Sequence, residues 1–238
     1  MDRHIRPKTG PDLGIQAVDI ALLSLFRRRI LTWYNMNGRH FPWRDRNRSD
    51  FEKVAAEILL QRTRAEVVAT MYPHFIAQFS NWQSIADADD ESLIQFLRPL
   101  GLWQRRAASI KKLAGAMVAL NGIFPSAREE VEKLPGVGQY IASAIMLLCH
   151  GQPNPLLDVN MARVLERFFG PRKLADIRYD PGLQALARAI TNHKRCLDIN
   201  WAILDFASLV CRPRTPACPG CPMLDKCFHA NRDDISHC

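Results

Sequence analysis

Four cysteines near the end of the chain restrict its fold more than any other feature. Cys211, Cys218, Cys221 and Cys227 lie within seventeen residues, in the spacing C-x6-C-x2-C-x5-C. Thiolates bind soft metals, and four thiolates this close can surround one centre. The segment has no hydrophobic core of its own, so a bound metal centre would give it order. Zinc and a [4Fe–4S] cluster both take four thiolates, and the spacing by itself leaves both open.

The rest of the composition predicts a globular protein from a reducing compartment. The chain has 238 residues, 47% of them hydrophobic, which is enough for one large domain or two joined ones. Residues 1–14 contain no apolar signal segment, and the apolar run over 141–149 is too short to span a bilayer. We therefore expect a cytoplasmic protein without a membrane segment, whose cysteines bind metal or stay reduced.

An excess of basic residues favours a polyanionic partner. Lysine and arginine number 32 against 24 acidic residues, for a formal charge of +8. The basic residues gather at 27–29, 39–48, 62–64 and 105–112. Ordinary surface charge accounts for each group alone. Together the groups could form a surface that follows DNA phosphates.

Apolar periodicity predicts an all-α fold. Residues at helical spacing, separated by Gly, Pro and Asn turns, predict helices over 17–35, 51–62, 65–79, 90–98, 103–120, 127–133, 139–149, 159–168, 181–193 and 200–210. No segment alternates in the way that a strand would. We expect Asp50 to cap the second of these helices, and residues 1–14 to form a flexible leader.

A glycine-containing turn and an acidic residue follow one another in the second half of the chain. Residues 134–138, Leu-Pro-Gly-Val-Gly, join two predicted helices, and amides at such a helix start attract phosphate. Asp158 comes twenty residues after Gly138, at the start of another predicted helix. Taken alone, the turn predicts a plain helix connection, and Asp158 predicts an N-cap that needs no function.

The order of the hairpin, Asp158 and the cysteines resembles the helix-hairpin-helix DNA glycosylases of the endonuclease III and MutY branch. The resemblance covers roughly residues 20–230 and implies a [4Fe–4S] cluster rather than zinc. It also implies a monomer that binds double-stranded DNA containing a mismatch or lesion. The DNA-contacting positions that it implies are Gln61, Arg62, Leu102, Gly136, Val137, Gly138, Asn160, Arg212 and Arg214.

The same resemblance assigns two catalytic positions. Asp158 corresponds to the carboxylate that stabilises positive charge on the sugar while the glycosidic bond breaks. Tyr140, eighteen residues earlier, stands where strand-cleaving relatives have a lysine that forms a Schiff base. A phenol cannot form one, so we expect a monofunctional glycosylase with little or no lyase activity.

Residues 56–63 resemble the adenine glycosylase pattern E-x-x-L-Q-x-T. Glu57 matches the glutamate that protonates adenine there, and Gln61, followed by Arg62, matches a residue that fills the space of the flipped base. Two features differ from adenine glycosylases: the chain ends shortly after Cys227, without their further domain, and Leu102 stands in place of a tyrosine wedge.

Glu57, Tyr140 and Asp158 together instead resemble the thymine/uracil mismatch glycosylases, so we expect excision of T or U opposite G in base excision repair. Adenine excision from A·G or A·8-oxoguanine is one alternative. A non-catalytic DNA-binding module with a structural metal is another.

We expect two helical lobes with DNA between them: a six-helix barrel over 45–155, and a cluster lobe from 15–44 and 156–238 that contains the iron–sulfur loop 211–227.

Overall fold

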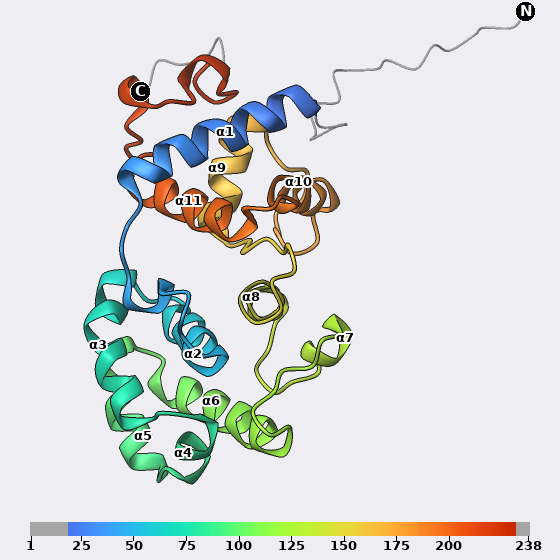
Figure 1. The fold of residues 1–238 in the computed structure, drawn as a ribbon. Helices are drawn as coiled ribbons and strands as arrows, with labels where there is room; N and C mark the ends of the chain where they lie inside the picture. Colours follow the sequence, from blue (N-terminus) through green and yellow to red (C-terminus); the bar gives the residue numbers. More distant parts are fainter. Residues whose placement is uncertain (1–18, 232–238) are drawn as a thin grey trace, which may run out of the picture. The chain divides into compact units, whose positions relative to one another are not determined.

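The computed structural model describes residues 19–231 (Figure 1). The leader expected over 1–14 and the last cysteine, Cys238, lie outside this range. Every regular element in the described part of the chain is a helix, which confirms the predicted all-α class. The described residues divide into two compact units. The first comprises residues 19–36, 157–190 and 201–231, and the second comprises residues 37–156 and 191–200.

The first unit contains α1 (Ile20–Asn37), α9 (Val159–Phe169), α10 (Pro181–Thr191) and most of α11 (Cys196–Leu209). Its core is aromatic: Phe26 packs on Phe168 with ring centroids 5.0 Å apart, and Trp33 packs edge-on against Phe206. The tail after α11 contains two short turns, η3 (Cys218–Gly220) and η4 (Leu224–Lys226). Its Phe228 amide donates to the Phe168 carbonyl, so the tail is fastened to the end of α9.

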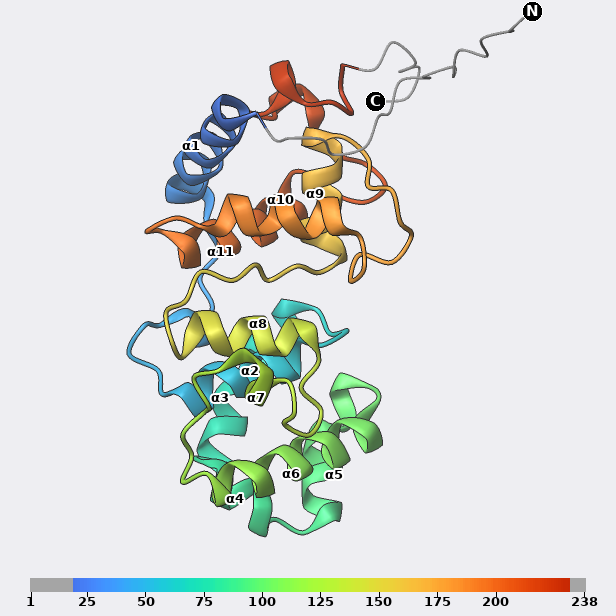
Figure 2. The same cartoon turned by 90° about the vertical axis from the view of Figure 1, so that its right-hand side faces the viewer.

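The second unit contains the helices from α2 to α8 (Figure 2). In chain order its elements are η1 (Pro42–Arg44), α2 (Asp50–Leu60), α3 (Ala65–Gln78), α4 (Trp82–Asp87), α5 (Asp90–Leu97), η2 (Arg98–Leu100), α6 (Trp103–Ala119), α7 (Arg128–Val131) and α8 (Gln139–Leu148). Helices α4 and α5 pack on α6, and α2 packs on both α3 and α8. This arrangement brings the end of α2, the start of α6 and the start of α8 to one pocket, described below.

Several helix ends differ from the sequence prediction. Asp50 does not cap α2: the Ser49 side chain accepts from the Glu52 amide, and Glu52 accepts from the Ser49 amide in return. This reciprocal capping box satisfies two amides, which explains why the helix starts one residue earlier than expected. Helix α4 was not predicted, because its six residues are too few for apolar periodicity to show. The helix expected over 200–210 begins earlier, at Cys196.

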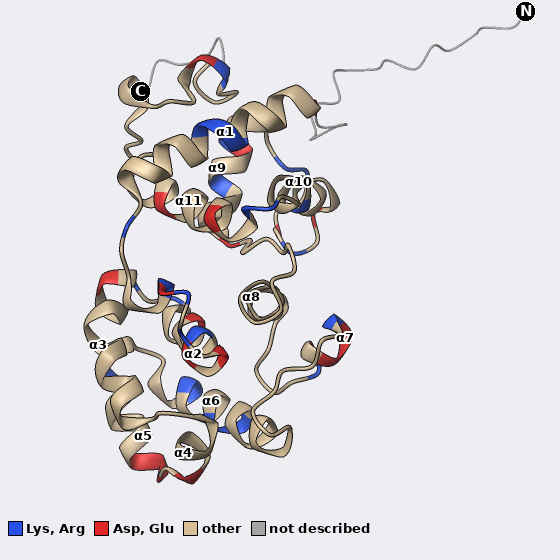
Figure 3. Ribbon diagram, in the orientation of Figure 1, with Lys and Arg blue, Asp and Glu red and all other residues tan. Residues whose placement is uncertain are grey.

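Basic residues are distributed over many elements of both units (Figure 3). Part of this charge is already paired, which the sequence grouping did not reveal. Arg48 contacts Glu52 over 2.7 Å, Arg46 contacts Asp198 over 3.0 Å, and Arg29 is bonded to Asp225. In residues 19–231, no helix is both long and apolar enough to cross a membrane.

Candidate active site

A buried carboxylate on α2 accepts a hydrogen bond from a tyrosine on α8. Glu57 lies three residues before the end of α2, with only 5% of its surface exposed. The hydroxyl of Tyr140, the second residue of α8, donates to Glu57 Oε2 over 3.0 Å. A carboxylate inside a core is costly unless polar groups compensate it, and such pairs are typical of functional sites. The structure thus brings together two of the predicted site residues.

A pocket of about 470 Å³ opens beside Tyr140. The end of α2, the first turns of α6 and the hairpin line it, and its lining includes Gln61, Arg62 and Leu102. Arg62 has a φ of 57° and Leu102 a φ of 48°, both in the left-handed region. A non-glycine residue there costs roughly 1–2 kcal/mol, and such strain concentrates at functional sites. Leu102 is 54% exposed, which leaves a large apolar side chain in contact with solvent at the pocket.

The hairpin at residues 134–138 packs closely against α6. Gly136 has a φ of 76°, and a Cβ there would lie 2.2 Å from Ser109 Oγ, so this position favours glycine on two grounds. Val137 is 8% exposed and its amide donates to the Leu134 carbonyl. Its side chain is therefore buried, and its amide is used within the turn. Among the described residues, the amides of Gly136 and Gly138 have no acceptor. These two amides, next to the start of α8, are the ones suited to an anion.

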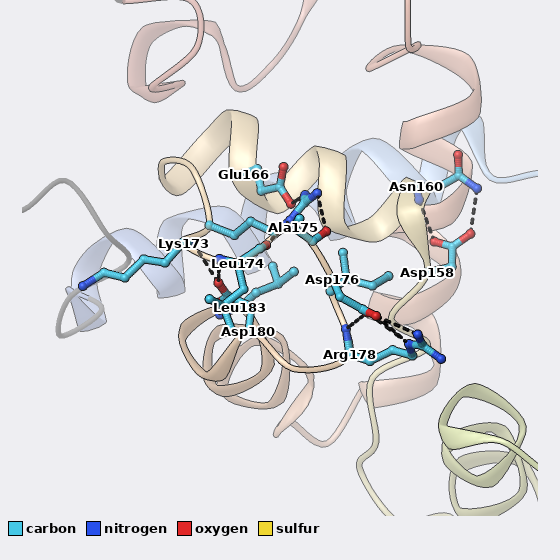
Figure 4. A network of polar contacts seen from close by, with 12 residues as sticks. Asp158, Asn160, Glu166, Lys173, Leu174, Ala175, Asp176, Arg178, Asp180 and Leu183 are labelled. Carbon is cyan, nitrogen blue, oxygen red and sulfur yellow. Dashed lines mark hydrogen bonds and ion pairs between the residues drawn. The ribbon is translucent and has the colours of Figure 1, made fainter.

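Asp158 belongs to the first unit, where it caps α9 (Figure 4). Its Oδ1 accepts from the amides of Asn160 and Met161 over 2.9 and 2.8 Å, so the predicted N-cap is confirmed. Its Oδ2 accepts from Asn160 Nδ2 over 2.7 Å. Both oxygens are therefore fixed in direction, and the half-buried carboxylate lies at the positive end of the helix. A fixed anion of this kind can stabilise a developing cation.

Arg163 connects the neighbourhood of Asp158 to the cysteine loop. Its Nη1 donates to Asn160 Oδ1 over 3.1 Å, its Nε to the Cys211 carbonyl over 2.8 Å, and its Nη2 to the Ala207 carbonyl over 2.9 Å. Loss of solvent on burial lowers the pKa of this guanidinium. A continuous set of hydrogen bonds thus runs from Asp158 through Asn160 and Arg163 to the main chain of the first cysteine.

The four cysteines line one small cavity in the first unit. All four are half-buried, the Met223 amide donates to Cys221 Sγ over 3.4 Å, and Arg167 Nη1 donates to Cys211 Sγ over 3.5 Å. Among residues 19–231, no three cysteine, histidine or acidic side chains converge in the manner of a single-ion metal site. The all-sulfur donor set and the N–H groups directed at two of the sulfurs fit a thiolate-bound centre.

The loop between the first two cysteines exposes both predicted phosphate contacts. Arg212 and Arg214 are exposed, and Arg212 Nε donates to the Thr215 carbonyl over 3.0 Å, which orders the turn. Arg167 holds the same loop through the Arg212 and Pro213 carbonyls. The loop is therefore shaped by main-chain contacts while the Arg214 side chain points into solvent.

Sequence reasoning missed two arginines that organise these sites. Arg106 stands in a group of basic residues that predicts surface charge, but it is 6% exposed and donates to three carbonyls and a hydroxyl. Arg163 received no role. The signal in the sequence for the burial of Arg106 is its position on the helix. It lies one residue before the buried Ala107 and four before the buried Ile110, which places it on the same face as Ile110.

The sequence and the fold resemble those of known DNA repair proteins. Residues 55–179 match the family model described as HhH-GPD superfamily base excision DNA repair protein. The chain is 35% identical to the thymine-DNA glycosylase of Aeropyrum pernix, over 91% of this chain and 99% of the relative. It is 34% identical to the thymine/uracil-DNA glycosylase of Pyrobaculum aerophilum, over 88% and 94%. A solved thermostable thymine-DNA glycosylase matches with a TM-score of 0.82 and 31% identity, over 88% of this chain and 97% of that one.

Adenine DNA glycosylases are also similar, but over a smaller part of their length. The human adenine DNA glycosylase is 30% identical over 88% of this chain, which corresponds to only 40% of the human protein. The family model spans more than half of the residues, and the archaeal relatives match over nearly their whole length. The chain belongs to the HhH-GPD superfamily of base excision DNA repair proteins.

Proposed function

We propose that the protein is a monofunctional DNA glycosylase that removes thymine or uracil opposite guanine. The observation that carries this proposal is the hydrogen bond between Tyr140 and the buried Glu57 beside a pocket of about 470 Å³. The names and full-length coverage of the archaeal relatives support the same choice of base.

The proposed reaction starts when the target nucleotide leaves the duplex, because its glycosidic bond is inaccessible inside the stack. Gln61 and Leu102 then occupy the space of the departed base. Glu57, held by Tyr140, acts in its acid form: its O–H donates to the departing base and offsets the negative charge that the base takes from the sugar. Asp158 stabilises the cationic sugar and orients water, whose oxygen bonds to the sugar carbon while a proton goes to the base.

The absence of strand cleavage is part of the proposal. A glycosylase with lyase activity needs an amine that forms a covalent imine with the opened sugar. Tyr140 presents a phenol beside the pocket, in place of the lysine expected from strand-cleaving relatives. The products are therefore a free base and an intact strand with an abasic site.

We further propose that Cys211, Cys218, Cys221 and Cys227 hold a [4Fe–4S] cluster. The common cavity and the N–H groups directed at Cys211 and Cys221 support this assignment. When bound, the cluster supplies order and local charge to the loop. Arg212 and Arg214 in that loop, Asn160 near Asp158, and the Gly136 and Gly138 amides contact DNA phosphates. Iron and sulfide analysis with visible absorbance tests the assignment; stoichiometric zinc without iron would overturn it.

A panel of labelled duplexes tests the substrate. Duplexes containing T·G, U·G, A·G or A·8-oxoguanine are incubated with excess protein, and the abasic product is cleaved with alkali. We expect product from T·G and U·G only. Product from the adenine-containing pairs alone would support the adenine alternative. If no duplex is processed although DNA is bound, the protein is a binding module rather than an enzyme.

A further inference from the structure

Arg106 of α6 is buried against the carbonyl end of α2. It is 6% exposed, and its Nη1 donates to the Ile58 and Leu59 carbonyls over 2.6 and 3.0 Å. Burial lowers the pKa of this guanidinium. Within residues 19–231 its hydrogen-bond partners are carbonyl and hydroxyl oxygens, and the negative end of the α2 dipole lies at the same place. A buried cation loses hydration energy that neutral partners only partly replace, so packing stability alone does not account for an arginine at this position.

The same guanidinium also fixes the turn that follows α2. Its Nη2 donates to the Gln61 carbonyl over 2.9 Å and to Thr63 Oγ1 over 3.1 Å. Between these two contacts lies Arg62, whose φ of 57° is strained. The planar fork of an arginine can serve all four acceptors at once, whereas the ammonium of a lysine cannot. Arg106 thus fixes the direction in which the turn at residues 61–63 presents the exposed Gln61.

A second turn, residues 100–102, is attached to the first through Thr63. The Thr63 hydroxyl lies 3.3 Å from the Leu100 carbonyl and also 3.3 Å from the Gln61 carbonyl, so its one proton is available to either turn. The Arg106 amide donates to the Leu102 carbonyl over 3.0 Å. Leu102 is itself in the left-handed region. Both turns line the same pocket. Arg106 and Thr63 therefore join the two strained turns that expose Gln61 and Leu102.

We infer that Arg106 is a positioning residue that holds these two turns at a fixed spacing, so that Gln61 and Leu102 enter the base stack together as the target base leaves. This inference rests on the proposed glycosylase function. Arg106 is only 6% exposed, and it acts through the main chain of Gln61 and the side chain of Thr63. Its contribution is largest when the stack must be opened by the protein, and smallest when the stack is already weakened.

Two duplexes and an Arg106→Lys variant separate this role from a general structural one. Both duplexes contain the same U·G pair, once in an otherwise fully paired duplex (the matched duplex) and once next to a C·C mismatch that weakens stacking (the weakened duplex). We expect the single-turnover rate of the variant on the matched duplex to fall roughly 10- to 100-fold, as for other displaced positioning groups. On the weakened duplex we expect a loss of about threefold or less, because less unstacking is required.

Lys111→Met is the matched control. Lys111 lies on the same helix, donates to the Ala88 carbonyl over 2.7 Å and is ion-paired with Asp90, but it does not line the pocket. Its loss removes a cation–carbonyl contact on α6 together with that ion pair. We expect equal rate changes on the two duplexes for this variant, whatever its effect on stability. Thr63→Val removes the hydroxyl shared by the two turns, and we expect its excision rate to fall on the matched duplex but not on the weakened one. Thr63→Ser keeps a hydroxyl, and we expect it to restore the rate on the matched duplex.

The outcomes are distinguishable. A selective loss on the matched duplex in Arg106→Lys or Thr63→Val, with the control showing none, supports the inference. Equal losses on both duplexes overturn the inference alone. If Arg106→Lys does not fold, Thr63→Val and Thr63→Ser decide the matter by the same comparison. If the wild-type protein processes neither duplex, the proposed function fails, and the inference fails with it.

Discussion

The Tyr140 hydroxyl of α8 donates to Glu57 Oε2 of α2 over 3.0 Å, although the two residues are 83 positions apart in the chain. We expect Glu57→Gln to lower the single-turnover excision rate about 10²- to 10⁴-fold, the usual contribution of a proton-handling group. Glutamine keeps an oxygen that can accept from Tyr140, so the fold should persist. Rapid-quench kinetics on a T·G duplex, with circular dichroism as a folding check, measure this effect. A variant with the wild-type rate would remove Glu57 from the mechanism.

Tyr140→Phe removes the other partner of the same hydrogen bond. The buried carboxylate then loses a donor, and we expect the free energy of unfolding to fall by about 1–3 kcal/mol. Denaturant unfolding of the wild type and the variant measures the difference. Unchanged stability would show that another group replaces the phenol as a donor to Glu57.

Asp158 allows catalysis to be separated from helix capping. Asparagine caps helices as well as aspartate does, so Asp158→Asn should keep α9 intact while it removes the negative charge. We expect the excision rate to fall at least roughly 10²- to 10³-fold, as when other fixed electrostatic groups are removed. Asp158→Ala should lose the same activity and, in addition, about 1 kcal/mol of stability because the cap is gone. Retained activity in Asp158→Asn would contradict the catalytic assignment.

The identity of residue 140 makes a separate prediction about strand cleavage. Wild-type protein should leave the DNA strand intact until alkali or heat is applied, and borohydride should trap no covalent complex. Tyr140→Lys supplies the amine that imine formation needs, so we expect a borohydride-trapped protein–DNA complex from this variant. Tyr140→Gln is the control without an amine. A trapped complex with the wild type would show that another residue supplies the nucleophile.

Features set by neighbouring residues, such as helix limits and caps, can be predicted from the sequence. Features set by contacts between distant residues, such as the burial of an arginine, cannot. Asp158 was predicted as an N-cap because the signal is local, and most of the long helices follow their apolar periodicity. The cap of α2 was assigned to the wrong residue, Asp50 instead of Ser49, because both types cap well and only the reciprocal bond to Glu52 distinguishes them.

The two arginines at the start of α6 show the limit more sharply. Arg105 and Arg106 are adjacent and identical in type, yet Arg105 is exposed and Arg106 is buried among carbonyls 45–48 residues away in the chain. Composition groups them together as surface charge. Only the packing of α6 on the end of α2 separates them, and the same is true of Arg163, whose acceptor at Cys211 lies 48 residues further on.

A buried carboxylate in the first unit predicts how the fold responds to acid. Asp180 is 1% exposed; burial alone would raise its pKa, but the amides of Leu174, Leu183 and Lys173 donate to it and hold its pKa below the usual value (Figure 4). A depressed folded-state pKa stabilises the fold above the unfolded-state value of about 3.9, and this stabilisation is lost as the pH falls through the folded-state pKa. The wild type should therefore lose stability as the pH drops below about 4, partly through this residue.

Asp180→Asn tests that contribution. Asparagine keeps one oxygen but replaces the other acceptor with an amino group, which faces amide donors. We expect the free energy of unfolding at pH 7 to fall by about 1.5–3 kcal/mol, the range for hydrogen bonds to a charged group. Because the variant has no charge to lose at this position, the difference from wild type should shrink as the pH falls toward 3. Urea unfolding across this pH range measures both quantities, and parallel stability curves for the two proteins would show that Asp180 does not titrate with folding.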